Sequence, residues 1–393
     1  MSFLTGFRCI DCGQEFAPDA VRYLCPTCSA DYHAGMPLKG ILEALFDYPA
    51  ITKAWKHGHS DCLHKNMHLL CNLLSPVDDE YYPNLPVGFS PLVASHALMG
   101  QAVHLKFDGV NPSGSYKDRA SHLMVAEARR LGIKQIVCAS TGNAACSTAA
   151  LCAAAGLEAV IFAPQSAPVA KLVQIRVHGA RLHKVDGTYD DAFAAALEYA
   201  AQNDCLCRNT AYHPYTIEGK KTAGLELWLQ MGIVPDYIYI PTGDGVILSG
   251  IYKAFTDLQR CGLIDRLPAL IAVQAESSDA ITRYHETGSY QDALKPDTIA
   301  DSISVRTPSA AHLAVQALNE TKGFGIRVTE AEIQTAQKVL AQRSGIFCEP
   351  SSAATLAALY KAKEQSRLIQ DASIVLMLTG HGLKDIQAVK LDD

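Results

Sequence analysis

One lysine stands directly after a turn and at the start of a predicted helix, in the stretch NPSGSYKDRAS at residues 111–121. The Asn-Pro-Ser-Gly run favours a turn, and the sequence from Lys117 onward can continue as helix. The helix macrodipole disfavours an ammonium group at this end and favours an anion or a neutral amine. A lysine that must lose its charge to attack a carbonyl group suits this position, and an ordinary surface lysine is the alternative interpretation.

Three other stretches place small and polar residues where strands are predicted to end. The first, STGNA, comprises Ser140, Thr141, Gly142, Asn143 and Ala144. Its N–H and hydroxyl groups could receive a carboxylate. The second, GDGVI, comprises Gly243, Asp244, Gly245, Val246 and Ile247. Its backbone N–H groups could close around a phosphate, although a tight turn explains the glycines equally well. The third, LTGHG, offers the Thr379 hydroxyl. With a lysine at a helix start, these loops describe a site for an anionic carbonyl cofactor, its phosphate and a substrate carboxylate.

Four cysteines near the N-terminus have the spacing of a metal site. They form two CxxC pairs: Cys9, Cys12, Cys25 and Cys28. Four thiolates can surround one tetrahedral zinc ion, and the alternative is a relic ribbon that holds no metal. Because four protein ligands leave no open coordination position, the predicted zinc site is structural. The remaining cysteines are predicted to be buried small hydrophobes.

The elements that must position these residues alternate along the chain beyond residue 90. Short apolar runs predict strands within 102–109, 135–140, 158–164, 180–187, 237–245, 269–276 and 372–382. Helices are predicted within 115–132, 143–156, 169–179, 189–203 and 247–262. This alternation predicts an α/β fold with mostly parallel sheets wrapped in helices, which bind ligands at the carboxyl ends of their strands. Before residue 90, residues 36–49 are predicted to form an amphipathic helix. The His-rich segment around 57–68 is interpreted as a polar loop, with a metal site as the alternative.

Composition excludes several classes of function. The 393 residues include 34 Lys and Arg against 40 Asp and Glu, for a net charge of −6, so nucleic acid is not an expected partner. No stretch approaches the roughly 18 apolar residues of a membrane span, so no membrane association is expected. The N-terminus lacks the pattern of a secretory signal, and thirteen cysteines, an odd number, indicate reduced thiols. We therefore expect a cytoplasmic protein.

Five motifs in order carry a resemblance to a known family: LKFDGVNPSGSYKDRAS, STGNAA, GDGVILSG, FCEPSSAATLAAL and LTGHGLKD. The chain resembles the pyridoxal-phosphate enzymes of the tryptophan-synthase-β type, fold type II, and within them the threonine synthases, including the cysteine-bearing N-terminal segment. The resemblance covers nearly the whole chain and is tightest over residues 85–385. It implies a PLP-dependent lyase, and a homodimer is usual in this fold type.

The resemblance also assigns roles to residues. It implies that Lys117 forms the Schiff base with pyridoxal 5'-phosphate and serves as the base for proton transfer. Asn143 would bond the ring's 3′-oxygen, and the Ser140–Ala144 loop would hold the substrate carboxylate. Gly243 to Ile247 would bind the cofactor phosphate, and Thr379 would face the pyridine nitrogen. A hydroxyl partner, unlike an aspartate, does not hold that nitrogen firmly protonated. The ring is then a milder electron sink, which suits elimination and replacement.

The substrate side departs from the family pattern. A threonine synthase acts on O-phosphohomoserine, and its relatives commonly carry an arginine for the substrate phosphate where this chain has Thr216. Threonine supplies neither the charge nor the bidentate fork of arginine. The candidate cations are Lys220 and Lys106, and Arg306 is a further candidate. Asn209 is also placed among the substrate contacts. Asp244 within the phosphate loop must point away or pair with a cation.

Several alternatives stay open at this level. A related enzyme could perform β-replacement or β-elimination on O-phosphoserine, serine or threonine, in the manner of cysteate synthase or a deaminase. A protein of another class would keep the cofactor without turnover, or would use the zinc ribbon to recruit a partner. The expected domains are residues 1–35, a zinc-ribbon-like segment; 36–109, a lead-in and part of the large domain; 110–215, a smaller mobile domain; and 216–393, the large domain with the phosphate cup.

Overall fold

The computed structural model describes residues 2–33, 35–165 and 169–389 and contains two compact units. The first unit comprises residues up to 88 together with Lys117–Thr222, and the second comprises Phe89–Tyr116 together with the chain from Ala223 onward. Each unit is therefore built from two separate stretches of sequence. The chain returns to the first unit at Lys117 itself, so this lysine marks a boundary in the fold.

A small antiparallel sheet of the order β2-β1-β3 opens the first unit. Its strands are β1 (Leu4–Cys9), β2 (Glu15–Phe16) and β3 (Leu42–Phe46). The helix predicted over residues 36–49 is wrong, because β3 lies there. Leu42, Ala44 and Phe46 are buried while the residues between them are partly exposed, which is the period of a strand.

Two helices follow where the His-rich segment was interpreted as a loop. Helix α1 (Tyr48–Gly58) is capped by Asp47, whose side chain accepts the N–H of Ala50 at 3.0 Å. Helix α2 (Leu63–Leu73) begins after Cys62. The loop interpretation is thus wrong for most of this segment, which is a helical pair. Cys62 is exposed and Cys71 is half-buried, so the prediction that the later cysteines are buried fails at these two positions. The 3₁₀ turn η1 (Asp79–Tyr81) follows.

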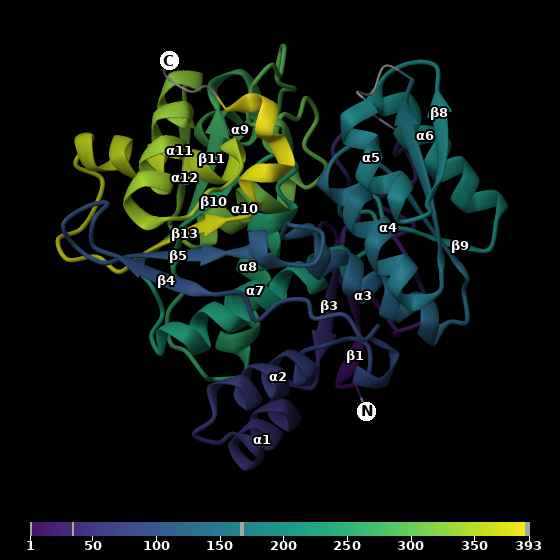
Figure 1. Cartoon of the computed structure of the whole chain (residues 1–393). Coiled ribbons are helices and arrows are strands. Elements are labelled where there is room, and N and C mark those ends of the chain that lie inside the picture. Colours follow the sequence, from purple (N-terminus) through teal and green to yellow (C-terminus); the bar gives the residue numbers. More distant parts are fainter. Residues whose placement is uncertain (1, 34, 166–168, 390–393) are drawn as a thin grey trace. The chain divides into compact units, whose positions relative to one another are not determined.

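The larger part of the first unit is a four-stranded parallel sheet of the order β8-β7-β6-β9. Its strands are β6 (Gln135–Ala139), β7 (Glu158–Pro164), β8 (Arg181–Val185) and β9 (Cys205–Cys207). The helices of this part are α3 (Lys117–Arg130), α4 (Asn143–Ala155), α5 (Val169–Val177) and α6 (Tyr189–Gln202). Helices α4 and α6 pack against β6 and β7 (Figure 1). Gly156 ends α4 with a φ of +66°, a conformation that glycine adopts without strain.

A six-stranded sheet of the order β12-β11-β10-β13-β5-β4 forms the second unit. Its strands are β4 (Leu92–Ser95), β5 (Val103–Phe107), β10 (Tyr237–Pro241), β11 (Ala269–Ala275), β12 (Phe324–Val328) and β13 (Ile374–Leu378). All neighbours pair in parallel except β4 with β5. The core lies where α12 covers this sheet, and it includes Tyr239, Ile271 and Leu376. The predicted α/β fold with mostly parallel sheets is confirmed.

Helices and short 3₁₀ turns connect these strands. The helices are α7 (Tyr215–Met231), which runs from one unit into the other, α8 (Val246–Arg260), α9 (Ala280–Thr287), α10 (Ala311–Glu320), α11 (Glu330–Ser344) and α12 (Pro350–Glu364). The 3₁₀ turns are η2 (Asp108–Val110), η3 (Glu276–Ser278), η4 (Asp301–Ile303) and η5 (Gly382–Ala388). Parallel strands require such crossover connections, which place a loop at the carboxyl end of every strand.

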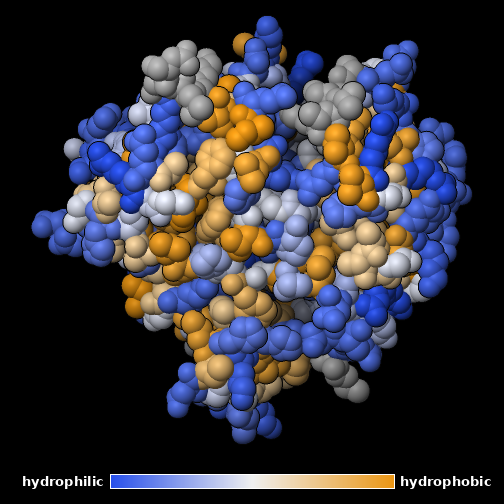
Figure 2. Space-filling model, in the orientation of Figure 1, coloured by the Kyte–Doolittle hydropathy of each residue, from blue (hydrophilic) through white to orange (hydrophobic). Residues whose placement is uncertain are grey.

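Apolar side chains on the face shown in Figure 2 are interspersed with hydrophilic ones. Exposed large hydrophobic residues occur at scattered positions such as Val177, Leu294 and Leu383. In the part of the chain that the structure describes, no helix has both the length and the apolar character needed to cross a membrane.

Candidate active site

Lys117 is the first residue of α3 and is half-buried. The residues directly before it are fastened to the end of β13. The N–H of Tyr116 donates to the carbonyl of Thr379 at 2.7 Å, and the N–H of His381 donates to the carbonyl of Gly114 at 3.0 Å. The Lys117 amine makes no hydrogen bond or ion pair with a described residue. The backbone around this lysine is held in place while its amine is left open to a ligand.

A hydrogen bond between two helices places Lys117 and Asn143 at adjoining helix ends. The Ser147 hydroxyl on α4 donates to the Ser121 hydroxyl on α3 at 2.7 Å, and both residues are buried. Ser121 lies four residues after Lys117, and Ser147 lies four residues after Asn143, so each pair shares one helix face. The predicted lysine and asparagine therefore begin two helices that are pinned together one turn further in.

The STGNA loop follows β6 as predicted, and Asn209 braces it. The side-chain Oδ1 of Asn209 accepts the N–H of Ala139 at 2.7 Å, and Ala139 is the last residue of β6. Within the loop, the N–H of Gly142 donates to the Ser140 hydroxyl at 3.2 Å. All five loop residues, Ser140, Thr141, Gly142, Asn143 and Ala144, are half-buried. The Asn209 amide nitrogen is buried without a protein partner, so a ligand could use it.

The GDGVI loop has the form of an anion cup. Helix α8 begins at Val246, and Gly245 precedes it with a φ of +83°. Among the described residues, the N–H groups of Gly243, Gly245 and Ile247 have no protein acceptor. The Asp244 carboxylate accepts the N–H of Val246 at 3.1 Å, which resolves how an acidic residue is accommodated in this loop. Three open donors at a helix N-terminus suit a phosphate monoester.

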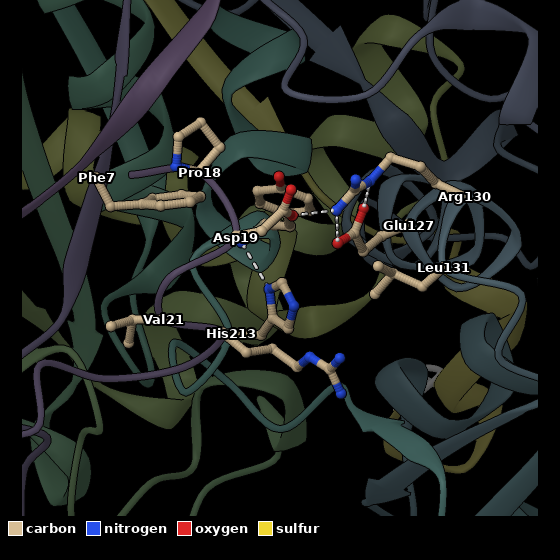
Figure 3. A pocket seen from close by; sticks show the side chains of 10 residues that line it. Phe7, Pro18, Asp19, Val21, Glu127, Arg130, Leu131 and His213 are labelled. Atoms are coloured by element: carbon tan, nitrogen blue, oxygen red, sulfur yellow. Dashed lines mark hydrogen bonds and ion pairs between the residues drawn. The ribbon is translucent and has the colours of Figure 1, made fainter. Parts of the chain in front are cut away.

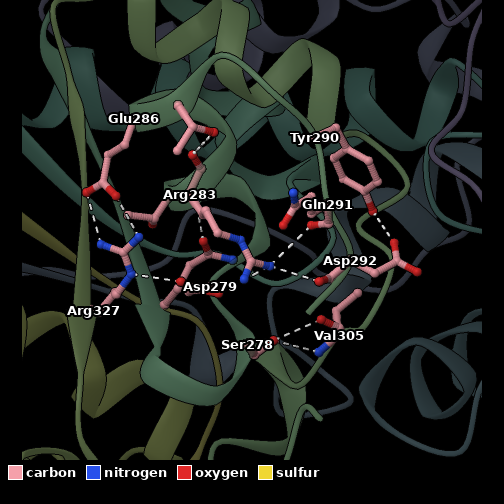
Figure 4. Close-up of polar contacts among 12 residues, drawn as sticks. Ser278, Asp279, Arg283, Glu286, Tyr290, Gln291, Asp292, Val305 and Arg327 are labelled. Carbon is pink, nitrogen blue, oxygen red and sulfur yellow. Dashed lines mark hydrogen bonds and ion pairs between the residues drawn. The ribbon is translucent and has the colours of Figure 1, made fainter. Parts of the chain in front are cut away.

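Close packing behind the cup explains the glycine at 243. A Cβ atom there would lie 2.9 Å from the Cα of Ile303 and 3.0 Å from a methyl group of Val305. Ser278 holds this backing segment, because its hydroxyl accepts the N–H of Val305 at 2.9 Å (Figure 4). The same hydroxyl lies 3.0 Å from the carbonyl oxygen of Ile303. Any larger residue at 243 would push the cup away from its support.

Thr379 ends β13 and is backed by a carboxylate that sequence analysis gave no role. Its hydroxyl donates to Glu349 at 3.4 Å and lies 3.3 Å from the hydroxyl of Ser352. Glu349 is only 3% exposed and also accepts the Ser302 hydroxyl at 3.3 Å. The only signal in the sequence is that Glu349 stands before the proline that opens α12, within the motif FCEPSSAATLAAL.

Of the three candidate cations for a substrate phosphate, Lys106 is held by other protein groups and Arg306 is exposed to solvent. The Lys106 amine is buried and donates to the Ser90 carbonyl, Glu226 and Gln230, each at 2.8 Å. Since an ammonium group has three donors, Lys106 has none left for a phosphate. The Arg306 side chain is 67% exposed and lies 3.7 Å from Asp292, as a surface arginine does. Lys220 is fully buried in α7.

Thr216, at the position of the family arginine, is a structural residue of its own loop. Its hydroxyl contacts the carbonyl of Thr210 and lies 2.9 Å from the carbonyl of His213. These contacts close the turn that leads into α7. They leave no capacity to bind a substrate anion, so another cation must perform that task if the substrate is phosphorylated.

The four N-terminal cysteines are brought together as predicted. Their Sγ atoms all lie within 4.8 Å of one another, and those of Cys12 and Cys25 are 3.8 Å apart. A tetrahedral zinc–thiolate site with bonds of about 2.3 Å has sulfur–sulfur separations of about 3.8 Å. Cys9 and Cys25 are buried, Cys28 is half-buried and Cys12 is exposed. The donor set and its size fit zinc.

The ribbon also contacts the segment that follows β9. Tyr23, two residues before Cys25, accepts the N–H of Cys207 through its hydroxyl at 3.1 Å. Its ring lies 4.8 Å from that of Tyr212, and the ring of His213 meets it edge-on at 5.5 Å. The segment containing Asn209 is therefore supported by the ribbon.

A pocket of about 150 Å³ lies between the ribbon and α3, beside these aromatic residues (Figure 3). Arg130 projects to its rim, where it pairs with Glu127 at 2.7 Å and Asp19 at 2.9 Å. His213 lines it, and burial lowers the pKa of this histidine to about 3, so the ring is neutral near neutral pH. The charges of Arg130, Glu127 and Asp19 pair with one another, and Arg22 is a further cation in the lining.

Comparison with known proteins decides the family. Residues 84–380 match the family described as pyridoxal-phosphate dependent enzymes. The chain belongs to this family. Among curated members of this PLP family, it is 33% identical over 390 residues to the threonine synthase of Methanosarcina acetivorans, covering 97% of this chain and 93% of the relative. It is 35% identical over 315 residues to the threonine synthase of Mycobacterium bovis, covering 79% of this chain and 86% of the relative.

Two solved structures support the fold. The processed form of threonine deaminase isoform 2 from Solanum lycopersicum superposes with a TM-score of 0.68 at 23% identity, covering 82% of this chain and 85% of that one. Maize serine racemase gives a TM-score of 0.65 at 23% identity, covering 75% and 88%. The resemblance to fold type II is thus confirmed, and pyridoxal 5'-phosphate is the cofactor.

The residues present fit this PLP cofactor. An aldehyde requires an amine, and the open amine of Lys117 supplies it. A phosphate requires several converging donors, and the Gly243–Ile247 cup has N–H groups without an acceptor among the described residues. A Cβ atom at Gly243 would push the cup away from the segment behind it, so the cup requires glycine there. The buried hydroxyl of Ser115, two residues before Lys117, is a further donor without a protein partner.

Proposed function

We propose that this PLP enzyme is a threonine synthase, which converts O-phosphohomoserine and water to threonine and phosphate. The observation that carries the proposal is the open amine of Lys117 at the start of α3, with its backbone held by β13. Full-length similarity to curated threonine synthases supports the choice among PLP reactions. The bound cofactor would supply an electron sink that makes the α-proton of an amino acid acidic.

The residues of this chain have distinct tasks in that reaction. Lys117 would hold the cofactor covalently and, once released, its Nζ would take the substrate's α-proton and then a β-proton. The substrate carboxylate would bind in the Ser140–Ala144 loop, and Asn143 would orient the ring through its 3′-oxygen. After the γ-phosphate leaves, the γ-carbon would be protonated, water would add at the β-carbon and a proton would return to the α-carbon, which yields threonine. The Gly243–Ile247 cup and Thr379 would hold the cofactor's phosphate and ring nitrogen.

A second reaction has one specific observation in its favour. Thr216 stands where relatives carry the arginine for a substrate phosphate, and its hydroxyl is engaged within its own loop. A β-replacement or β-elimination on serine, threonine or O-phosphoserine would demand a different pocket. The experiment below distinguishes this second reaction from the threonine synthase reaction.

Titration of the holoenzyme separates these reactions. The visible spectrum is recorded with O-phosphohomoserine, O-phosphoserine, serine and threonine, and released phosphate and product amino acid are assayed in parallel. We expect a spectral change, phosphate release and threonine with O-phosphohomoserine. A response to a β-substituted amino acid with none to O-phosphohomoserine would assign the enzyme to the rival reaction. No response to any amino acid would point to a protein without turnover.

We expect Glu349 to tune the cofactor ring through Thr379. With the Thr379 proton donated to the carboxylate, its lone pairs can accept a hydrogen bond from a protonated ring nitrogen. Glu349→Gln should therefore favour the unprotonated ring and lower kcat by about tenfold, because the carboxylate acts on the ring only through Thr379. The ¹⁵N NMR shift of ring-labelled cofactor measures the protonation directly. Ser302→Ala, which removes another hydroxyl that donates to Glu349, is the matched control and should leave that shift nearly unchanged.

Two further features complete the proposal. We propose that Cys9, Cys12, Cys25 and Cys28 bind one structural zinc ion, as their geometry permits. The family resemblance favours a homodimer, which light scattering on the purified protein would test.

A further inference from the structure

Arg208 is a buried cation without an anionic partner. It follows β9 directly and is 2% exposed. Its Nε donates to the Ser121 hydroxyl at 3.2 Å, while its Nη2 is buried with no hydrogen-bond partner. Among the described residues, no carboxylate lies within ion-pair distance of this guanidinium. Burying an unpaired charge is costly, so its retention requires an explanation.

The groups around Arg208 do not neutralise it. The thiols of Cys138 and Cys207 interact electrostatically with Arg208, and burial raises the pKa of both, that of Cys207 to about 12. Both thiols are therefore uncharged near neutral pH. The remaining described contact, the Ser121 hydroxyl, is also neutral. An anion from outside the protein is the partner that this guanidinium lacks.

The position of Arg208 connects it with the substrate side. Ser121, its hydrogen-bond partner, lies one turn after Lys117 on the same face of α3. Ser121 also accepts a hydrogen bond from Ser147, which lies one turn after Asn143 on α4. Arg208 also adjoins Asn209, whose oxygen braces the STGNA loop. The guanidinium thus lies at the junction of α3 and α4, in the same unit as both predicted site residues.

Unpartnered polar atoms are concentrated around this position. Besides Arg208 Nη2, the Asn209 amide nitrogen, the Thr210 hydroxyl and the His213 Nε2 are buried without partners. Thr210 also has a φ of +35°, which is strained for a β-branched residue. Because native proteins satisfy nearly all buried polar atoms, such a concentration marks a segment built to meet a ligand.

We infer that Arg208 binds an anionic group of the substrate and supplies the cation that Thr216 does not. This inference rests on the proposed function. The anionic groups of the substrate each offer a pair of anionic oxygens, to which the guanidinium can donate through Nη2 and a neighbouring N–H. Those oxygens belong either to the substrate phosphate or to its α-carboxylate, and ligands with and without phosphate distinguish the two.

Two substitutions and one control test the inference in the holoenzyme. Arg208→Met removes the charge and keeps an unbranched apolar chain, Arg208→Lys keeps the charge without the fork, and Arg306→Met removes an exposed arginine. We expect Arg208→Met to raise KM for O-phosphohomoserine by about 100-fold, as loss of a charge-assisted hydrogen bond predicts. Arg208→Lys should give an intermediate KM, and Arg306→Met should leave it within twofold. Equal KM values for all four proteins would overturn the inference.

Thermal stability separates a binding role from a structural one. Since the unpaired charge is costly, Arg208→Met should unfold at the same Tm as the wild type or at a higher one. Inorganic phosphate should raise the Tm of the wild-type holoenzyme, whose cofactor fills the Gly243–Ile247 cup, but not that of Arg208→Met. A lower Tm in both Arg208 variants, with unchanged ligand effects, would make Arg208 a structural residue.

The ligands also separate this inference from the proposed function. If Arg208→Met weakens the spectral response to O-phosphohomoserine but not to threonine, the guanidinium binds the phosphate, and if it weakens both, it binds the carboxylate. Should the wild type fail to convert O-phosphohomoserine, the proposed function is wrong. The Tm shifts with phosphate, serine and threonine would then still decide whether Arg208 binds an anion.

Discussion

Lys117→Ala should abolish turnover and, at the same time, the visible absorbance of the Schiff base in the purified protein. The substitution removes the amine that holds the cofactor and the base that moves the α-proton, so we expect activity to fall by on the order of 10³-fold or more. The backbone should be unaffected, because it is anchored through Tyr116 and Gly114 and not through the side chain. Absorbance, mass of the borohydride-reduced protein and threonine formation are measured together.

Two variants control this experiment. Lys117→Arg keeps a cation at the helix start but cannot form the Schiff base, so it should be as inactive as the alanine variant. Lys134→Ala, at an exposed lysine that follows α3, should behave as the wild type. If Lys117→Ala retained the absorbance band and the reduced adduct, another lysine would be the covalent site and the assignment would be wrong.

Loss of the ribbon metal should produce the second large effect, on stability. We expect the purified protein to contain one zinc ion per chain, and Cys25→Ser to contain none. The free energy of unfolding should fall by about 4 kcal/mol, because a structural zinc site contributes directly to folding. Metal analysis and chemical denaturation check both expectations.

Cys62→Ser is the matched control for the metal site, because Cys62 is an exposed cysteine outside the cluster. It should retain both the metal and the stability of the wild type. A wild-type protein that is purified free of metal and whose Tm does not change with chelator would contradict the zinc site. The cysteines would then be a ribbon held by packing alone.

The parts of the fold that sequence analysis predicted are those with a strong local pattern. Helix α4 was predicted over 143–156 because an alanine-rich run ends at a glycine, and it ends at Ala155. Strands β5, β6, β7, β8, β10, β11 and β13 of the two larger sheets were identified as short apolar runs between helices, whereas β4, β9 and β12 were not predicted. The site loops followed from them, since parallel sheets place their loops at the carboxyl ends of strands.

The errors arose where tertiary pairing decides the structure. Residues 36–49 contain enough apolar residues to suit either period, and the pairing of β3 with β1 selects the strand. Arg208 and Glu349 were missed for a related reason. Neither residue type is unusual in its local sequence, and their importance lies in what they contact or fail to contact: a serine 87 positions away for Arg208 and a threonine 30 positions away for Glu349.

The hydrogen bond from Cys207 to Tyr23 bears on how far the chain could be shortened. A minimal enzyme without residues 1–35 would leave the Cys207 N–H without its acceptor and the ring of Tyr212 without its neighbour. It would also lack Tyr23 and Tyr32, which pack against the core cluster that contains Cys205 and Cys207 of β9, directly before Arg208. Residues 1–35 therefore support the segment that contains Arg208 and Asn209. A truncated chain should bind its substrate more weakly, even where the cofactor still binds.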